Sequence, residues 1–175
     1  MAAVKKRDDG RTERVLVESA MVAEILADDD PGGFTIGYDT GCCMTLGGAS
    51  ESCIWAGYQD PNYAFFTVRD RGDRLRAQSI LYIAEAMGKK YLVADNIEAN
   101  GNTDVSKIAG IYRQALVEFI QQQNLDIDAI HIGVGYVQAG ILDELADATV
   151  TPPTPRAGTY TDAAKQKVLW QKASD

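Results

Sequence analysis

The stretch over residues 90–136 constrains the fold more than any other part of the chain, because it has the pattern of strand, turn, long helix and strand. A short apolar run rich in strand formers leads into a cluster of Asn and Gly at residues 100–104, which predicts a turn. Apolar side chains then recur every three or four residues over 105–123, as in an amphipathic helix. A second apolar strand follows at 129–136. Two strands joined by a crossover helix usually lie parallel in one sheet.

Two further predicted strands precede this unit. Residues 63–69 are rich in strand formers, and a turn at 70–73 separates them from a long strand-like segment at 75–86. Gly88 and Lys89 turn the chain into the strand that begins at Lys90. The predicted fold class is therefore mixed α/β, with a largely antiparallel meander and one parallel strand after a long crossover helix.

The N-terminal third is more difficult to assign. Residues 1–11 are charged and are expected to form a mobile tail, so that one domain covers 12–175. Apolar positions over 12–27 predict a helix, ended by the proline and glycines that follow residue 30. In the glycine-rich part after it, we expect strands at 34–38 and 42–46, and a third at 52–58 that pairs back through a Gly-Gly turn.

The charge balance restricts the class of partner. The chain has 175 residues, of which 25 are acidic and 17 are basic, so its formal net charge is -8. An acidic surface repels phosphate backbones, which argues against non-specific binding of nucleic acid. No apolar run approaches the length of a membrane span, and the N-terminus lacks the apolar segment of a secretory leader. With three cysteines in such a chain, we expect a cytoplasmic protein with reduced thiols.

The order of the predicted elements resembles the GNAT superfamily, the fold of acetyl-CoA-dependent N-acetyltransferases. The likeness is one of element order, and it rests on residues 64–68, 75–85, 91–99, the helix from 105, and 130–136, with 160–162 and 168–170 as a closing hairpin. In the family, a loop of the type Arg/Gln-x-x-Gly-x-Gly/Ala follows the fourth strand and holds the cofactor diphosphate through backbone N–H groups. Here residues 98–105 take that place, with Gly101 as their one glycine and no Lys or Arg before Lys107.

The resemblance implies transfer of an acetyl group from acetyl-CoA to the amine of a small molecule or a protein. Such chemistry needs a base for the amine, for which Glu98 or Asp95 is placed, and an acid for the leaving thiolate, for which Tyr136 or Tyr160 is placed. The family pattern places the contacts to acetyl-CoA at Val93, Ala94, Asn100, Gly101, Asn102 and Thr103. The simpler interpretation is that Asp95, Asn96 and Glu98 are turn and capping residues at a strand end.

A second interpretation is a protein with the same fold and no catalytic activity. The missing basic residues before Lys107 favour a GNAT-like interaction module that acts through contacts with a protein partner. The glycine-rich region over 32–57 offers loops for such contacts.

Two short motifs suggest other chemistry. Asp39-Thr40-Gly41 resembles the triplet that carries the nucleophilic carboxylate of aspartic proteases, but a single copy has to pair with another chain and turn use is the simpler reading. Gly133-x-Gly135 follows a strand, as in a dinucleotide fingerprint, but no third glycine or immediate helix follows. Close packing or a bulge of the strand is the ordinary interpretation.

The three cysteines and the single histidine define one more alternative, a thiol- or metal-dependent enzyme. Cys42, Cys43 and Cys53 with His131 contain the ligand types of a zinc site, but they lack a C-x-x-C pair, so no metal site is expected and buried thiols are the favoured interpretation. A dyad of Cys43 and His131 is the remaining possibility for nucleophilic chemistry. Because His131 lies within an apolar run, a hydrogen-bonded core histidine is the more common explanation.

Overall fold

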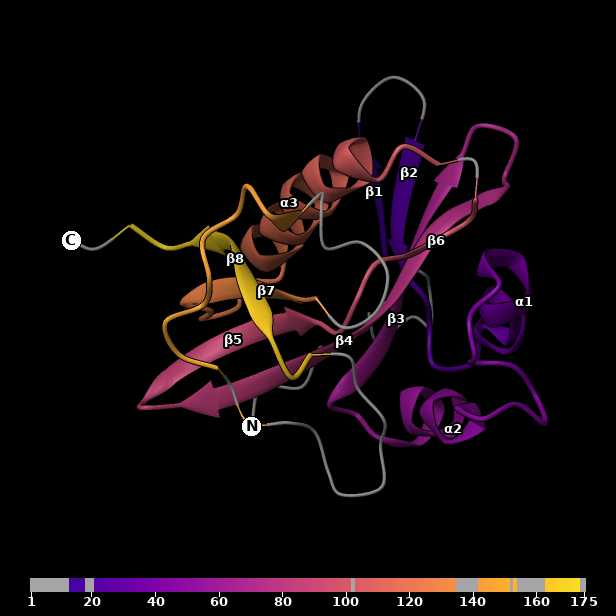
Figure 1. Cartoon of the computed structure of the whole chain (residues 1–175), viewed down its shortest axis with the longest axis horizontal. Helices are drawn as coiled ribbons and strands as arrows, with labels where there is room; N and C mark the ends of the chain where they lie inside the picture. The colour runs from indigo at the N-terminus through magenta and orange to yellow at the C-terminus, as the bar shows by residue number, and fades with distance from the viewer. Residues whose placement is uncertain are drawn as a thin grey trace.

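One eight-stranded mixed sheet runs through the computed structural model of the chain, in the order β1-β2-β3-β4-β5-β7-β8, with a short strand β6 beside β4 (Figure 1). The structure describes residues 13–17, 21–101, 103–134, 142–151, 153 and 163–173. Strands β5 and β7 are parallel to each other, and the other described strand pairs are antiparallel. The predicted fold class is therefore confirmed.

The sheet begins with a hairpin where a helix was predicted. Residues 12–27 contain β1 (Glu13–Val17) and β2 (Met21–Ile25), which are antiparallel and place Val15 opposite Ala23. The helix prediction was wrong because β2 also pairs with β3, and pairing on both edges outweighs a helix-like spacing of apolar residues. The β-branched Val22 of β2 suits the pleated surface.

The predicted meander is confirmed. It consists of β3 (Tyr63–Asp70), β4 (Leu75–Ala86) and β5 (Lys89–Ala94). The turn between β3 and β4 is organised by the Asp70 carboxylate, whose Oδ1 accepts hydrogen bonds from the backbone N–H groups of Gly72 at 2.8 Å and Arg74 at 3.1 Å. The long β4 lies in the centre of the sheet. It therefore positions the residues of the neighbouring strands that pair with it.

The crossover unit is also confirmed. Helix α3 (Val105–Gln122) connects the meander to β7 (Ala129–Gly133), which lies parallel to β5 with Tyr91 opposite Ala129. Asn124, with a φ of 49°, follows the helix in the left-handed conformation that asparagine tolerates. Strand β8 (Gln166–Gln171) pairs antiparallel with β7 and contains the predicted segment 168–170. The predicted strand at 160–162 lies outside the described residues.

The apolar residues Ile141, Leu142 and Leu145 predict a short helix over 137–148, and the structure describes this segment from residue 142 onward. Within 142–148, a single residue, Leu142, is helical, and Asp147 forms an isolated bridge with Lys167 on β8. The described part of this segment therefore follows the edge of the sheet, and the helix prediction was wrong there.

The glycine-rich region forms helices where three strands were predicted. It contains the short 3-10 turn η1 (Pro31–Phe34), α1 (Ile36–Thr40) and α2 (Glu51–Gln59). A Cβ added at Gly37 would overlap the carbonyl oxygen of Met44, and one added at Gly57 would overlap the ring of Phe65. These glycines therefore allow close packing around the small helices, of Gly37 on the Met44 backbone and of Gly57 on the Phe65 ring. The sequence pattern alone does not distinguish glycines used for close packing from glycines used in hairpin turns.

The sheet is covered on both faces, with α3 on one side and α1 and α2 on the other (Figure 1). The core under α3 contains Ile108, Ile111, Tyr112 and Leu116 packed on Leu81 and Leu92. The core under α1 and α2 contains Ile36, Met44, Cys53 and Ile54 packed on Phe65, Ile80 and Tyr82. The candidate site lies at the α1–α2 face of β4.

Candidate functional site

A bulge interrupts the strand that follows β4. Both β5 and the two-residue strand β6 (Glu98–Ala99) pair with β4, with Ala94 opposite Leu81 and Glu98 opposite Gln78. Three residues, 95–97, therefore face two residues of β4, 79 and 80, so that the strand carries one extra residue. Such bulges redirect side chains and are common beside functional sites.

Asp95 holds this bulge together. Its Oδ1 accepts hydrogen bonds from the backbone N–H groups of Ile80 at 2.9 Å and Asn96 at 2.8 Å, while its own N–H donates to the carbonyl of Ile80 at 3.0 Å. The hydroxyl of Ser79 donates to the carbonyl of Asn96. One carboxylate oxygen of Asp95, a predicted catalytic residue, is thus already used to shape the backbone.

The parallel pair ends at the same place. The last paired position of β5 and β7 is Ala94 opposite Ile132, and the next residue of β7, Gly133, lies so close to Asp95 that an added Cβ would overlap the carbonyl oxygen of Asp95. Beyond this point the first strand continues as β6 beside β4, whereas the N–H of Val134 donates to the carbonyl of Lys165 at 3.0 Å. The two strands therefore lie side by side in one sheet and their pairing ends at the bulge, where Gly133 serves the close packing expected for it.

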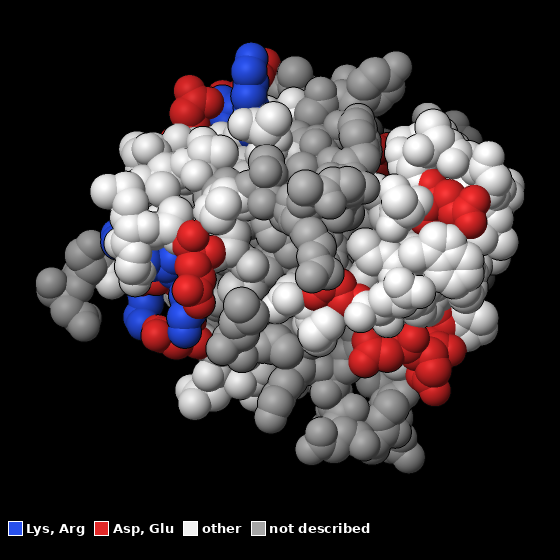
Figure 2. Space-filling view, turned by 90° about the horizontal axis from the view of Figure 1, so that it is seen from below, with Lys and Arg blue, Asp and Glu red and all other residues white. Residues whose placement is uncertain are grey.

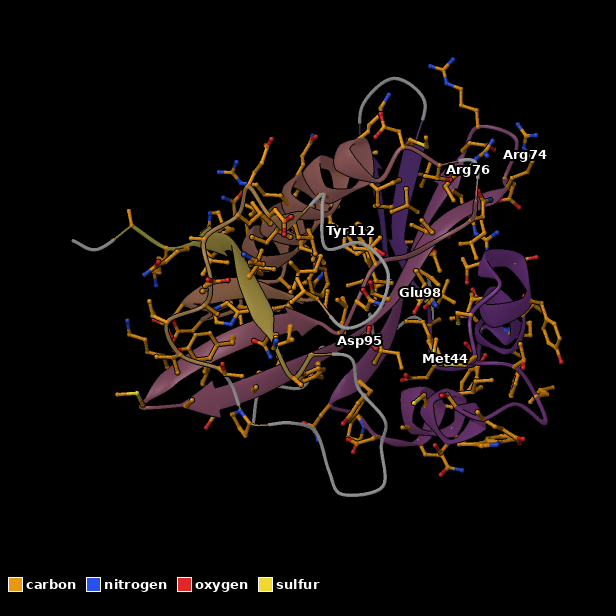
Figure 3. The ribbon with its side chains drawn as sticks, in the orientation of Figure 1. Met44, Arg74, Arg76, Asp95, Glu98 and Tyr112 are labelled. Carbon is orange, nitrogen blue, oxygen red and sulfur yellow. The ribbon has the colours of Figure 1, made fainter. Side chains whose placement is uncertain are left out.

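A small cavity lies between the bulge and the α1–α2 segment. Gln78 and Glu98 are directly opposite each other on neighbouring strands, so their side chains share one face, and together with Asp95 they line the sheet side of the cavity. The opposite wall consists of Cys42, Cys43, Met44 and Cys53. Figure 3 shows Asp95, Glu98 and Met44 between the strands and the α1–α2 segment. The cavity has a volume of about 10 Å³, which is close to what one water molecule needs.

The polar groups of the cavity are unequally satisfied. The amide Nε2 of Gln78 donates to Cys42 Sγ at 3.4 Å, and the side chain is fully buried, but its Oε1 has no hydrogen-bond partner in the described structure. Glu98 Oε1 accepts from Asn96 Nδ2 at 3.2 Å. Gln78 was not predicted as a site residue. The signal for it was a polar amide in the middle of a long, otherwise buried strand.

Cys42 is a neutral thiol in this environment. Burial raises its pKa to about 11, with a further rise from the charge of Glu98, against a smaller lowering by the N–H of Met44 that donates to its sulfur at 3.4 Å. The thiolate is the form that acts as nucleophile or metal ligand. Cys42 is therefore a structural residue at neutral pH. The prediction of buried thiols is confirmed for Cys53, whereas Cys42 is partly buried and Cys43 is exposed.

His131 is a hydrogen-bonded core residue. It is buried on β7, its Nδ1 lies 2.9 Å from Gln166 Oε1, and its ring is tilted by 50° against that of Tyr91 with centroids 4.7 Å apart. Because Gln166 Nε2 donates to the carbonyl of Ala163 at 2.8 Å, its Oε1 is the acceptor and Nδ1 of the imidazole carries the proton. Burial lowers the pKa of His131. Among the residues that the structure describes, no group of three or more His, Cys, Asp or Glu side chains is placed to hold a metal ion.

Several of the residues predicted to contact acetyl-CoA are buried in the sheet or already form structural hydrogen bonds. Val93 and Ala94 are fully buried in β5 between β4 and β7. Asn100 Nδ2 donates to the carbonyl of Leu75 at 2.7 Å, and Thr103 Oγ1 donates to Asn100 Oδ1 at 2.8 Å. These two side chains fix the turn that leads into α3. Asn102 and the predicted acid Tyr136 lie outside the described residues.

The N-terminus of α3 carries a negative cap. Asp104 is exposed, and its Oδ1 accepts from the N–H of Lys107 at 3.4 Å, so a carboxylate already occupies a first-turn donor that a diphosphate would use. Gly101 is exposed with open space around it, and Lys107 is an exposed cation in the same turn. In the described part of this turn, one cation, Lys107, therefore lies beside the Asp104 carboxylate.

The triplet Asp39-Thr40-Gly41 forms a helix end. Asp39 and Thr40 belong to α1, Thr40 Oγ1 donates to the carbonyl of Ile36 at 2.8 Å, and Gly41 caps the helix with a φ of 70°. An aspartic protease presents its carboxylate on a loop, so the protease interpretation was wrong. Gly41 is required here by the left-handed backbone conformation.

Comparisons with known proteins give limited matches. No protein-family model matches the chain, and no curated protein sequence matches it either. A solved structure that is similar is a GCN5-related glucosamine N-acetyltransferase region of a fungal multi-domain GH3 beta-N-acetylglucosaminidase, with 15% identity and a TM-score of 0.46. The match covers 69% of this chain and 14% of that chain. In the described part of the chain, no helix combines the length and apolar character needed to cross a membrane.

Proposed function

We propose that the chain is a GNAT-like acyltransferase that transfers an acetyl group to an amine, with Glu98 as the base. The observation that carries the proposal is the coincidence of three features at one point: the end of the β5–β7 parallel pair, the bulge at 95–97, and the Glu98 carboxylate at the edge of a cavity. The resemblance to the GNAT superfamily places the base at this same point, at Glu98 or Asp95, directly before the crossover helix. Acetyl-CoA, when bound, supplies the acetyl group as a thioester.

The described residues have separate tasks in this proposal. Asp95 keeps the bulge in shape through two backbone N–H groups, which leaves Glu98 directed into the cavity. The Glu98 carboxylate accepts the proton that the amine nitrogen loses as the new C–N bond forms. The C–S bond of the thioester breaks in the same reaction, and the departing thiolate takes a proton from an acid, for which Tyr136 is the predicted residue.

The proposal is tested by calorimetric titration with acetyl-CoA and by an acetylation assay over a panel of amines. We expect acetyl-CoA to bind, and Glu98→Gln to lower kcat/KM by about a hundredfold, because positioned general bases contribute 10²–10⁴-fold. The control is Glu118→Gln, since Glu118 lies on α3 remote from the cavity and pairs with Gln122 at 2.9 Å. Absence of binding heat at high micromolar acetyl-CoA contradicts the proposal.

A second candidate, a non-catalytic GNAT-like interaction module, is favoured by two specific observations. The N-terminus of α3 is capped by Asp104, and the cavity has a volume of only about 10 Å³, so neither offers the open, positively polarised cleft of a typical donor site. This candidate predicts a chain that binds a protein partner with acetyl-CoA absent. The same titration separates the two candidates.

A further inference from the structure

We propose that the cavity beside Glu98 binds the terminal ammonium group of a primary alkylamine, and that Gln78 is the residue that selects it. The inference rests on the proposed function, because the amine is the acceptor in acyl transfer. It adds which end of the acceptor enters and which side chain recognises it. Three independent features of the site support it.

The first feature is the unpartnered acceptor of Gln78. Its side chain is 0% exposed, and its Nε2 is directed to Cys42 Sγ, which leaves the buried Oε1 without a hydrogen bond at the cavity. A buried acceptor without a partner costs about 1–3 kcal/mol. An N–H donor of a bound ligand removes that cost, whereas an apolar ligand does not.

The second feature is the size and charge of the cavity. Two of the described lining residues, Asp95 and Glu98, are acidic, and none is Lys or Arg. The volume of about 10 Å³ admits a group of the size of one water molecule. An ammonium group is compact and carries three donors, so it matches the acceptors Gln78 Oε1 and the Glu98 carboxylate. The alkyl arm of the ligand stays outside this volume.

The third feature is the field of the surrounding segment. Residues 21–68, which include α1 and α2, contain seven acidic residues and no Lys, Arg or His: Glu24, Asp28, Asp29, Asp30, Asp39, Glu51 and Asp60. Figure 2 shows acidic side chains over the α1–α2 end of the visible face, with the described Lys and Arg side chains gathered elsewhere on it. A cleft bordered by one sign of charge concentrates ligands of the opposite sign.

The test is titration of the chain, without acetyl-CoA, with n-butylamine and two matched probes. We expect n-butylamine to bind, 1-butanol not to bind because it lacks the charge, and butyltrimethylammonium not to bind because it lacks N–H donors. Gln78→Met, which keeps the length of the side chain and removes the acceptor, should weaken n-butylamine binding by at least about tenfold. The control Gln59→Met changes an exposed glutamine of α2 and should leave binding unchanged.

The outcomes are separable from those of the proposed function. The inference is overturned if n-butylamine binds equally well to Gln78→Met and wild type, or if n-butylamine and 1-butanol bind equally well. It is also overturned by a crystal structure in which one water molecule stays on Gln78 Oε1 at saturating n-butylamine. If acetyl-CoA binds and n-butylamine does not, the proposed function stands and the inference fails. If n-butylamine binds and acetyl-CoA does not, the amine site stands and the proposed function fails. Should Gln78→Met fail to fold, Glu98→Gln at the half-buried carboxylate is expected to show the same tenfold loss.

Discussion

At the residue scale, the three thiols differ in exposure and therefore in reactivity. Cys43 is exposed, Cys42 is partly buried and Cys53 is buried. Because burial raises the pKa of Cys42 to about 11, very little of it is thiolate at pH 8. We expect one cysteine to react rapidly with a disulfide reagent at pH 8 in the native protein, and three after denaturation.

The control for this prediction is a pair of matched variants. Cys43→Ser should abolish the rapid phase, and Cys42→Ser should retain it. A rapid phase that disappears in Cys42→Ser instead contradicts the assignment of Cys42 as a neutral, structural thiol.

Part of the candidate site was predictable at this scale. Asp95 and Glu98 follow a predicted strand directly, and polar residues at a strand end are recognisable from sequence. Gln78 and its contact with Cys42 were not predicted, because the two residues meet only when β4 is paired with β6 and the α1–α2 segment is folded over it. They are 36 positions apart in the chain, so no local pattern connects them.

At the scale of elements, the close approach of β5 and β7 depends on one glycine. Replacing Gly133 by alanine puts a methyl group into the carbonyl of Asp95, so β7 must move away from the bulge. We expect Gly133→Ala to lower the free energy of unfolding by about 3 kcal/mol or more, measured by urea denaturation.

The same substitution at Gly110 is the control. Gly110 lies within α3 with open space around it, and alanine is a better helix former than glycine. Gly110→Ala should therefore raise the free energy of unfolding by up to about 1 kcal/mol. A Gly133→Ala variant as stable as wild type excludes the proposed close contact.

At the scale of the whole molecule, stability should depend on pH through one imidazole. His131 is the only histidine of the chain, and burial lowers its pKa below the ordinary 6.5. Between pH 6.5 and the lower pKa of folded His131, the unfolded chain binds the proton more readily than the folded chain. The free energy of unfolding therefore falls as the pH falls below about 6.5. Above that range His131 is neutral in both states and contributes no slope.

This prediction is measured by urea denaturation of wild type and His131→Asn at pH 8, 7, 6 and 5. The difference between the two proteins isolates the imidazole from the titration of carboxylates and from the change of net charge. We expect the stability advantage of wild type over His131→Asn to shrink steadily between pH 7 and 5. An advantage that grows on acidification contradicts a buried, neutral His131.

The sequence by itself determined the meander from β3 to β5, the helix α3 and the parallel strand β7. The helix carries a period of about 3.6 residues because one of its faces is buried. The strands are short runs rich in apolar residues because both faces of the sheet are covered. The tertiary structure decided the β1–β2 hairpin, the small helices α1 and α2, and the cavity. In these segments the local pattern is compatible with more than one conformation, and pairing with β3 or close packing of glycine on Met44 and Phe65 selects among them.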